Sequence, residues 1–85
     1  MDYYLRMHYV YVLRSKNFDE IYIGQTADLK KRLTDHNSGK SKHTSKYKPW
    51  NIAGYYAFSI KEKAVLFEKY LKTASGKAFM RKRLI

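Results

Sequence analysis

Two short runs of alternating residues near the N-terminus constrain the fold of this chain more than any other feature. In residues 9–13 and again in 21–24, aliphatic side chains alternate with tyrosines. Successive side chains of a β-strand point to opposite faces, so each run would place its aliphatic residues on one face and its tyrosines on the other. The polar segment 15–20 has the composition of a hairpin connection. We therefore expect a β-hairpin, with strands at 8–14 and 21–25, that buries its aliphatic face and presents tyrosine hydroxyls on the other.

A helix is predicted directly after the hairpin, at about 27–37. Leu29 and Leu33 are four residues apart, which places them on one side of a helix. Thr26 is a candidate N-cap, and Gly39 can adopt the left-handed conformation that ends many helices. This helix would pack a narrow leucine stripe against a neighbouring surface.

The second half of the chain is predicted to hold one more strand and two helices. Residues 52–58 have a strand pattern, and residues 59–62 match a capping box. A helix is therefore expected at 60–74, interrupted by the Ser-Gly pair at 75–76 and followed by a short basic helix at 77–84. The fold class predicted is α/β, with a small three-stranded, mainly antiparallel sheet flanked by helices.

Length and composition restrict the class of protein. With 85 residues, the chain is expected to form a single domain over 1–85. It has no cysteine, which excludes disulfide bonds and thiolate metal sites. No stretch reaches the ~18–20 consecutive apolar residues of a membrane span, and no secretory signal pattern opens the chain. We expect a cytoplasmic protein without a membrane partner.

Positive charge is the strongest global feature. Eighteen Lys and Arg against seven Asp and Glu give a formal net charge of +11. A compact basic domain favours a phosphate-backbone partner, because each neutralised phosphate releases a counterion; a merely solvated cationic surface is the alternative. The segment 40–48 lacks apolar periodicity and is predicted to be a mobile basic loop that contacts phosphates. The candidate nucleic-acid-binding residues are Lys40, Lys42, Lys46, Lys48, Lys77 and Arg81.

Glu68 is the carboxylate that remains after the other acidic residues are given structural roles. Its helical position lies beside Ala64, at the edge of the expected apolar stripe. Asp35, in contrast, is expected on the outer side of the first helix. A carboxylate near a packed surface either pairs with a base or binds a hard cation. The simpler alternative is an i, i+4 ion pair with Lys72, worth ~0.3–0.5 kcal/mol.

Arg32 and His36 lie four residues apart on the first predicted helix and border its leucine stripe. Each has a structural alternative, because Asp28 can pair with Arg32 and a histidine near a helix C-terminus suits the helix dipole. Tyr11 and Tyr22 can likewise be aromatic residues of a half-buried sheet. Their co-occurrence with a glutamate in a downstream helix favours a shared chemical role.

The two tyrosine motifs resemble those that name the GIY-YIG endonuclease superfamily. Tyr9-Val10-Tyr11 is followed, after ten residues, by Tyr22-Ile23-Gly24. The stretches at 36–40 and 48–50 are typical of small standalone bacterial members that resemble an excinuclease subunit. The resemblance covers roughly residues 8–84. The residues that continue the family pattern are Gln25, Thr26, Arg32, His36 and Glu68.

This resemblance implies a role for each matching residue. Family members cleave phosphodiester bonds with one divalent cation, and Glu68 would hold Mg²⁺ or Mn²⁺. Tyr11 and Tyr22 match tyrosines of the active centre, one of which takes a proton from the attacking water. Arg32 would stabilise charge on the pentacovalent phosphate, and His36 would assist with proton transfer or phosphate contact. A phenol with a pKa near 10 is a poor base unless nearby cations stabilise its phenolate.

The implied activity is that of a metal-dependent DNA endonuclease core without strong sequence specificity. The expected substrates are branched, damaged or single-strand-containing DNA, and the sequence does not separate DNA from RNA. A protein partner would supply specificity. Tyr9 replaces the glycine of the family name, and Gln25 stands where several members carry a lysine. The alternative is a catalytically weak or inactive nucleic-acid-binding module on the same fold.

Overall fold

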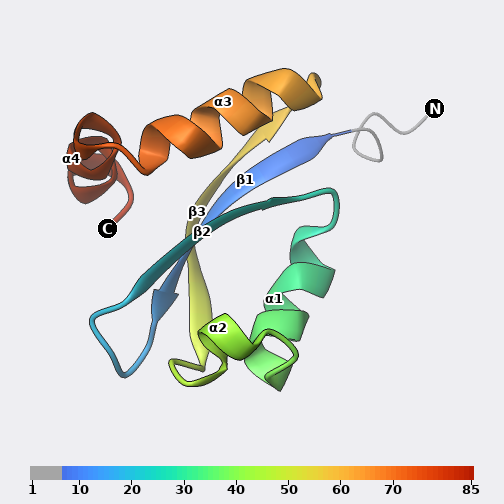
Figure 1. The fold of residues 1–85 in the computed structure, drawn as a ribbon, viewed down its shortest axis with the longest axis vertical. Coiled ribbons are helices and arrows are strands. Elements are labelled where there is room, and N and C mark those ends of the chain that lie inside the picture. Colours follow the sequence, from blue (N-terminus) through green and yellow to red (C-terminus); the bar gives the residue numbers. More distant parts are fainter. Residues whose placement is uncertain (1–6) are drawn as a thin grey trace.

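A sheet of three strands, covered by helices, forms the framework of the protein (Figure 1). The computed structural model describes residues 7–85. Its strands are antiparallel and lie in the order β2-β1-β3, which confirms the predicted α/β class. No helix in this range has both the length and the apolar character needed to cross a membrane. The elements are β1 (His8–Ser15), β2 (Ile21–Thr26), α1 (Leu29–Ser38), α2 (Lys42–Ser45), β3 (Trp50–Phe58), α3 (Lys61–Leu71) and α4 (Ala74–Arg83).

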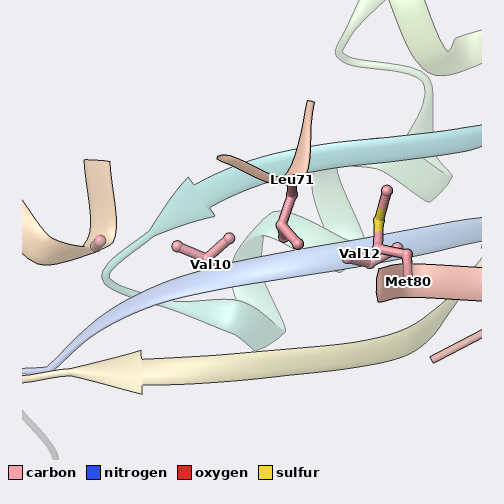
Figure 2. Close-up of a cluster of buried hydrophobic side chains, with 5 residues drawn as sticks. Val10, Val12, Leu71 and Met80 are labelled. Carbon is pink, nitrogen blue, oxygen red and sulfur yellow. The ribbon is translucent and has the colours of Figure 1, made fainter. Parts of the chain in front are cut away.

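The aliphatic face of β1 forms the first of two hydrophobic cores. Val10 and Val12 are buried there because α3 and α4 pack over this face of the central strand. Figure 2 shows both valines with Leu71 of α3 and Met80 of α4. The predicted burial of the aliphatic face is therefore confirmed.

The tyrosine face of β1 forms the second core. Tyr11 and Leu13 are buried there together with Trp50, and Leu29 and Leu33 of α1 pack against them. The predicted leucine stripe of the first helix is thus confirmed. The expectation that this face presents its hydroxyls is wrong for Tyr11, because helices cover both faces of the sheet.

The helix ends differ from prediction where the capping residues differ. Asp28, rather than Thr26, is the N-cap of α1, and its carboxylate accepts a hydrogen bond from the backbone N–H of Lys31 at 3.1 Å. Gly39 ends α1 with a φ of 84°, as predicted. The capping box expected before α3 is not formed, because Ile60 is the N-cap there and no side chain bonds to the first turn.

The lysine-rich segment 40–48 is not the mobile loop that its composition predicted. It contains α2, and Thr44 of that helix is buried. The indole N–H of Trp50 donates to the backbone oxygen of Thr44 at 3.0 Å, and the hydroxyl of Ser15 donates to the backbone oxygen of Tyr47 at 2.6 Å. These two bonds hold the segment against the sheet while its lysines remain exposed.

The junction between the last two helices also differs from prediction. α3 ends at Leu71, and the hydroxyl of Thr73 caps α4 by accepting from the backbone N–H of Gly76 at 3.1 Å. The Ser-Gly pair therefore lies inside α4 rather than between helices. A Cβ atom at Gly76 would lie 2.0 Å from the backbone oxygen of Tyr70 and 2.5 Å from the Cα of Leu71. The first turn of α4 thus contacts the backbone of α3 directly.

Replacing Gly76 with alanine should destabilise the domain, although alanine is the better helix former by about 1 kcal/mol. The obstructing atoms are backbone and cannot move aside as a flexible side chain would. The free energy of unfolding, measured by urea denaturation, should fall by about 1–3 kcal/mol or more. Ser75→Ala, at the exposed neighbouring position, should stay within about 0.5 kcal/mol of wild type. Equal stability of Gly76→Ala and wild type would contradict the direct helix contact.

Candidate active site

Tyr11 and His36 form a buried hydrogen-bonded pair between β1 and α1. The side chains are 2% and 0% exposed, and the Tyr11 hydroxyl lies 3.0 Å from Nε2 of His36. The other ring nitrogen, Nδ1, lies 2.8 Å from the hydroxyl of buried Thr44 in α2. A neutral imidazole has one N–H donor and one acceptor nitrogen. With Nδ1–H donating to Thr44, Nε2 is free to accept the phenolic proton of Tyr11.

Tyr22 completes an aromatic cluster around this pair. Its ring centroid lies 4.7 Å from that of His36 and 6.2 Å from that of Tyr11. Tyr22 is only partly buried, unlike Tyr11. The structure thus brings together both motif tyrosines and the histidine of α1.

Gly24 provides the space that the Tyr11 hydroxyl occupies. The two residues are directly opposite in the β1–β2 register. A Cβ atom at position 24 would lie 2.6 Å from the hydroxyl oxygen of Tyr11. The second motif therefore ends in glycine for a steric reason, because any side chain at position 24 would displace the phenol of Tyr11.

Arg32 is a partly exposed residue of α1 that interacts with Tyr11 of the Tyr11–His36 pair. Burial raises the pKa of Tyr11, and the neighbouring guanidinium of Arg32 opposes that rise by stabilising the phenolate. The pKa of His36 is lowered, first by burial and then by the positive charge of Arg32. At neutral pH the pair therefore consists of a neutral phenol and a neutral imidazole. This differs from the cation-driven activation expected from sequence, since burial outweighs Arg32 at the phenol.

Asp35 does not lie on the outer side of α1, as predicted, but is buried near Arg32. Its carboxylate accepts from the ammonium of Lys31 at 3.1 Å, lies 3.5 Å from that of Lys40, and reaches the Arg32 guanidinium at 4.0 Å. The hydrogen bond from Lys31 is the main reason that the pKa of Asp35 is lowered. The carboxylate partner of Arg32 is thus Asp35, and Asp28 serves as the helix cap instead.

Glu68 reaches the site from the opposite side of the sheet. Its Oε1 accepts a hydrogen bond from the amide of Gln25 in β2 at 2.5 Å, and its Oε2 accepts one from the ammonium of Lys72 at 2.9 Å. The side chain is only 17% exposed, so the carboxylate is not directed into solvent. Its negative charge adds a small further rise to the pKa of Tyr11. The ion pair with Lys72 is confirmed, and it coexists with the hydrogen bond from Gln25.

The carboxylate of Glu68 fits a hard divalent cation that is held by few protein ligands. Residues 7–85 contain no group of three or more His, Cys, Asp or Glu side chains that could enclose an ion. A single carboxylate suits Mg²⁺, which keeps several of its waters and takes further oxygen ligands from phosphates. Gln25 holds one carboxylate oxygen in place, and its amide can present either a donor or an acceptor.

The six predicted nucleic-acid-binding residues are all exposed, but they do not form one patch. Four belong to the segment around α2, and Lys77 and Arg81 belong to α4, on the other side of the sheet (Figure 1). Lys40 is also the partner of Asp35. Lys77 and Arg81 line a recess of about 250 Å³ beside the edge strand β2.

Two site residues were not predicted from sequence. Thr44 contacts His36, and Gln25 contacts Glu68 across 43 positions of the chain. Gln25 follows the second motif at a position where several family members carry a lysine, and nothing in the sequence indicates its partner. Thr44 is buried, but it lies in a lysine-rich stretch whose composition does not indicate a buried residue.

Comparison with known proteins places these residues in a family. The model of the GIY-YIG catalytic domain matches residues 7–83. A UPF0213 protein of Bacillus pumilus (strain SAFR-032) is 39% identical over 71 residues, which cover 82% of this chain and 71% of that protein. A UPF0213 protein of Streptococcus pyogenes serotype M5 is 40% identical over 65 residues, covering 75% and 70% of the two chains.

A solved structure agrees with these sequence matches. The solution NMR structure of a UPF0213 protein from Bacillus halodurans is similar with a TM-score of 0.55 and 33% identity, covering 89% of this chain and 83% of that one. The match of the family model extends over nearly all of the described residues. The chain therefore belongs to the GIY-YIG family of nuclease catalytic domains.

Proposed function

We propose that this chain is a single-domain, divalent-metal-dependent endonuclease that hydrolyses phosphodiester bonds of nucleic acid. The observation that carries the proposal is the set of groups around one phenol. The hydroxyl of Tyr11 contacts His36, interacts with Arg32, and lies within the electrostatic influence of Glu68. This combination supplies a proton acceptor, a fixed positive charge and a hard anionic ligand, which hydrolysis of a phosphodiester requires.

Tyr11 is the proposed general base, acting together with His36. The attacking water transfers a proton to the Tyr11 oxygen while the phenolic proton moves to Nε2 of His36, 3.0 Å away. The water oxygen forms the new bond to phosphorus, the bond to the leaving oxygen breaks, and the leaving alkoxide takes a proton from solvent. Tyr11 is preferred over Tyr22 because Tyr11 makes the hydrogen bond to the imidazole. Thr44 would hold the imidazole in the tautomer that accepts at Nε2.

Arg32 and Glu68 would manage the charge of the reacting phosphate. The partly exposed guanidinium of Arg32 lies 4.0 Å from Asp35 and interacts with the phenol, where negative charge would develop on the attacking side. Glu68 would hold Mg²⁺ or Mn²⁺, and the bound cation would polarise the phosphate and offset its charge. Gln25 would keep the carboxylate oriented.

The proposed substrate is DNA with branched, damaged or single-stranded parts, with RNA as the related alternative. The formal charge of +11 and the exposed lysines of segment 40–48 support binding through the backbone. Phosphate contacts position a nucleic acid but do not read its sequence. A protein partner would then select the target.

One observation favours a second candidate, a binding module without hydrolytic activity. Both oxygens of Glu68 are engaged, one by Gln25 and one by Lys72. If these contacts persist when nucleic acid is bound, the carboxylate holds no cation. Such a module would bind with a steep salt dependence and cleave nothing.

Glu68→Gln should abolish metal-dependent incision while leaving binding intact. Removing the carboxylate charge removes the proposed cation ligand but not the basic surface. Incision of branched and nicked DNA is measured with Mg²⁺ and with Mn²⁺, and affinity is measured without metal. Glu62→Gln, an exposed position on the same helix, is the matched control and should cleave like wild type. Equal incision by Glu68→Gln and wild type refutes the ligand role, and no incision by any form supports the binding module.

Tyr11→Phe should lower the cleavage rate by about 10²–10⁴ without unfolding the protein, because it removes one hydroxyl and keeps the ring. Tyr55→Phe, the residue directly opposite Tyr11 on β3, is the matched control. Single-turnover cleavage rates are compared with those of Tyr22→Phe. A greater loss for Tyr22→Phe than for Tyr11→Phe would reverse the assignment of the base.

The pKa of His36 should lie below the usual 6.5 because burial and Arg32 both disfavour the imidazolium. Arg32→Gln should raise this pKa, though not to its usual value, since burial remains. Lys30→Gln removes the same charge from an exposed position of α1 and should leave the pKa nearly unchanged. NMR titration of the imidazole protons measures each value. Because neutral His36 is the proton acceptor, activity should persist at pH 7 and decline only as pH falls through the depressed pKa; an acidic limb above 6.5 would contradict this.

A further inference from the structure

Both carboxylate oxygens of Glu68 are hydrogen-bonded within the protein. The neutral amide of Gln25 donates to Oε1, and the ammonium of Lys72 donates to Oε2. We propose that Lys72 occupies the cation position of the site and that a divalent ion must displace it from Glu68. Lys72 therefore sets the metal affinity of the protein, an inference that rests on the proposed role of Glu68 as the metal ligand.

The two contacts of Glu68 differ in charge, and this difference decides which contact a divalent ion would displace. Gln25 belongs to a strand and donates a neutral hydrogen bond that does not repel a nearby cation. Lys72 carries a full positive charge within 2.9 Å of the second oxygen. An ammonium and a divalent ion at one carboxylate repel each other, so binding of one opposes binding of the other.

The geometry of Lys72 allows its displacement without a change in the fold. It follows the last turn of α3, four residues after Glu68, and its side chain is 56% exposed. Ion pairs of this kind are weak because water solvates the ammonium once it leaves. Glu68 itself is 17% exposed and would be an uncompensated charge without a partner. Lys72 thus satisfies the carboxylate in the resting protein and is released when a stronger cation arrives.

Titration with Mg²⁺, followed by backbone amide NMR shifts around Glu68 and Gln25, tests this competition without any measurement of cleavage. Lys72→Met should lower the dissociation constant for Mg²⁺ by about two- to fivefold, the range expected from removing a half-exposed ion pair. Lys72→Gln, which is also uncharged, should change it in the same direction. Lys69→Met is the matched control, because Lys69 lies on the same helix, carries the same charge and has no ion-pair partner in the described part of the chain. It should leave the constant within about 1.5-fold of wild type, since exposed charges without close contact are screened.

The outcomes separate this inference from the proposed function. If Lys72→Met and Lys69→Met bind Mg²⁺ equally, Lys72 does not compete, although Glu68 remains the ligand. If the shifts persist in Glu68→Gln, or if wild type shows none, Glu68 holds no metal and both proposals fail. Tighter binding by Lys72→Met and Lys72→Gln alone, lost again in the double variant with Glu68→Gln, establishes the competition.

Discussion

The hydrogen bond between Tyr11 and His36 is the interaction on which the rest of the structure depends. Both side chains are buried, and leaving a buried polar group unpaired costs about 1–3 kcal/mol. Among residues 7–85, no fully buried side-chain nitrogen or oxygen lacks a partner. To keep this state, α1 must pack closely on β1, Thr44 must reach the second ring nitrogen, and position 24 must remain without a side chain. The proposed proton route and one of the two cores are therefore made of the same residues.

Burial also sets the electrostatic character of the site. It raises the pKa of the phenol and lowers that of the imidazole, so both groups rest in their neutral forms. Arg32 stabilises a phenolate but disfavours an imidazolium, so it does not by itself promote transfer of the phenolic proton from Tyr11 to His36. In the proposed mechanism, the negative charge of a bound phosphate would favour the imidazolium and so assist proton transfer along this pair.

Local patterns in the sequence predicted the parts of the fold and site that depend on local geometry. Strand alternation gave the two faces of β1, and i, i+4 spacing placed Arg32 and His36 together on one helix. The family resemblance linked them to Glu68. Features that depend on packing between distant segments were not predicted. The burial of Tyr11 follows from the packing of α1 against the sheet, and the contact from Gln25 to Glu68 joins positions 43 residues apart. The helix α2 was not predicted because its own lysine-rich composition does not indicate a helix. Hydrogen bonds to Ser15 and Trp50, which are close in space, hold this segment in place.

The central strand separates two cores that share few side chains. Val10 and Val12 pack with α3 and α4, whereas Tyr11 and Leu13 pack with α1 and Trp50. Changes at positions more than about 7–10 Å apart usually add in free energy, so substitutions in the outer helices of the two cores should combine nearly additively, whereas neighbours such as Val10 and Tyr11 should couple. The helical layer that carries Glu68 can therefore diverge in sequence without disturbing the layer that carries His36. In the proposed mechanism, the two helical layers would each supply part of the reaction chemistry from opposite faces of one sheet.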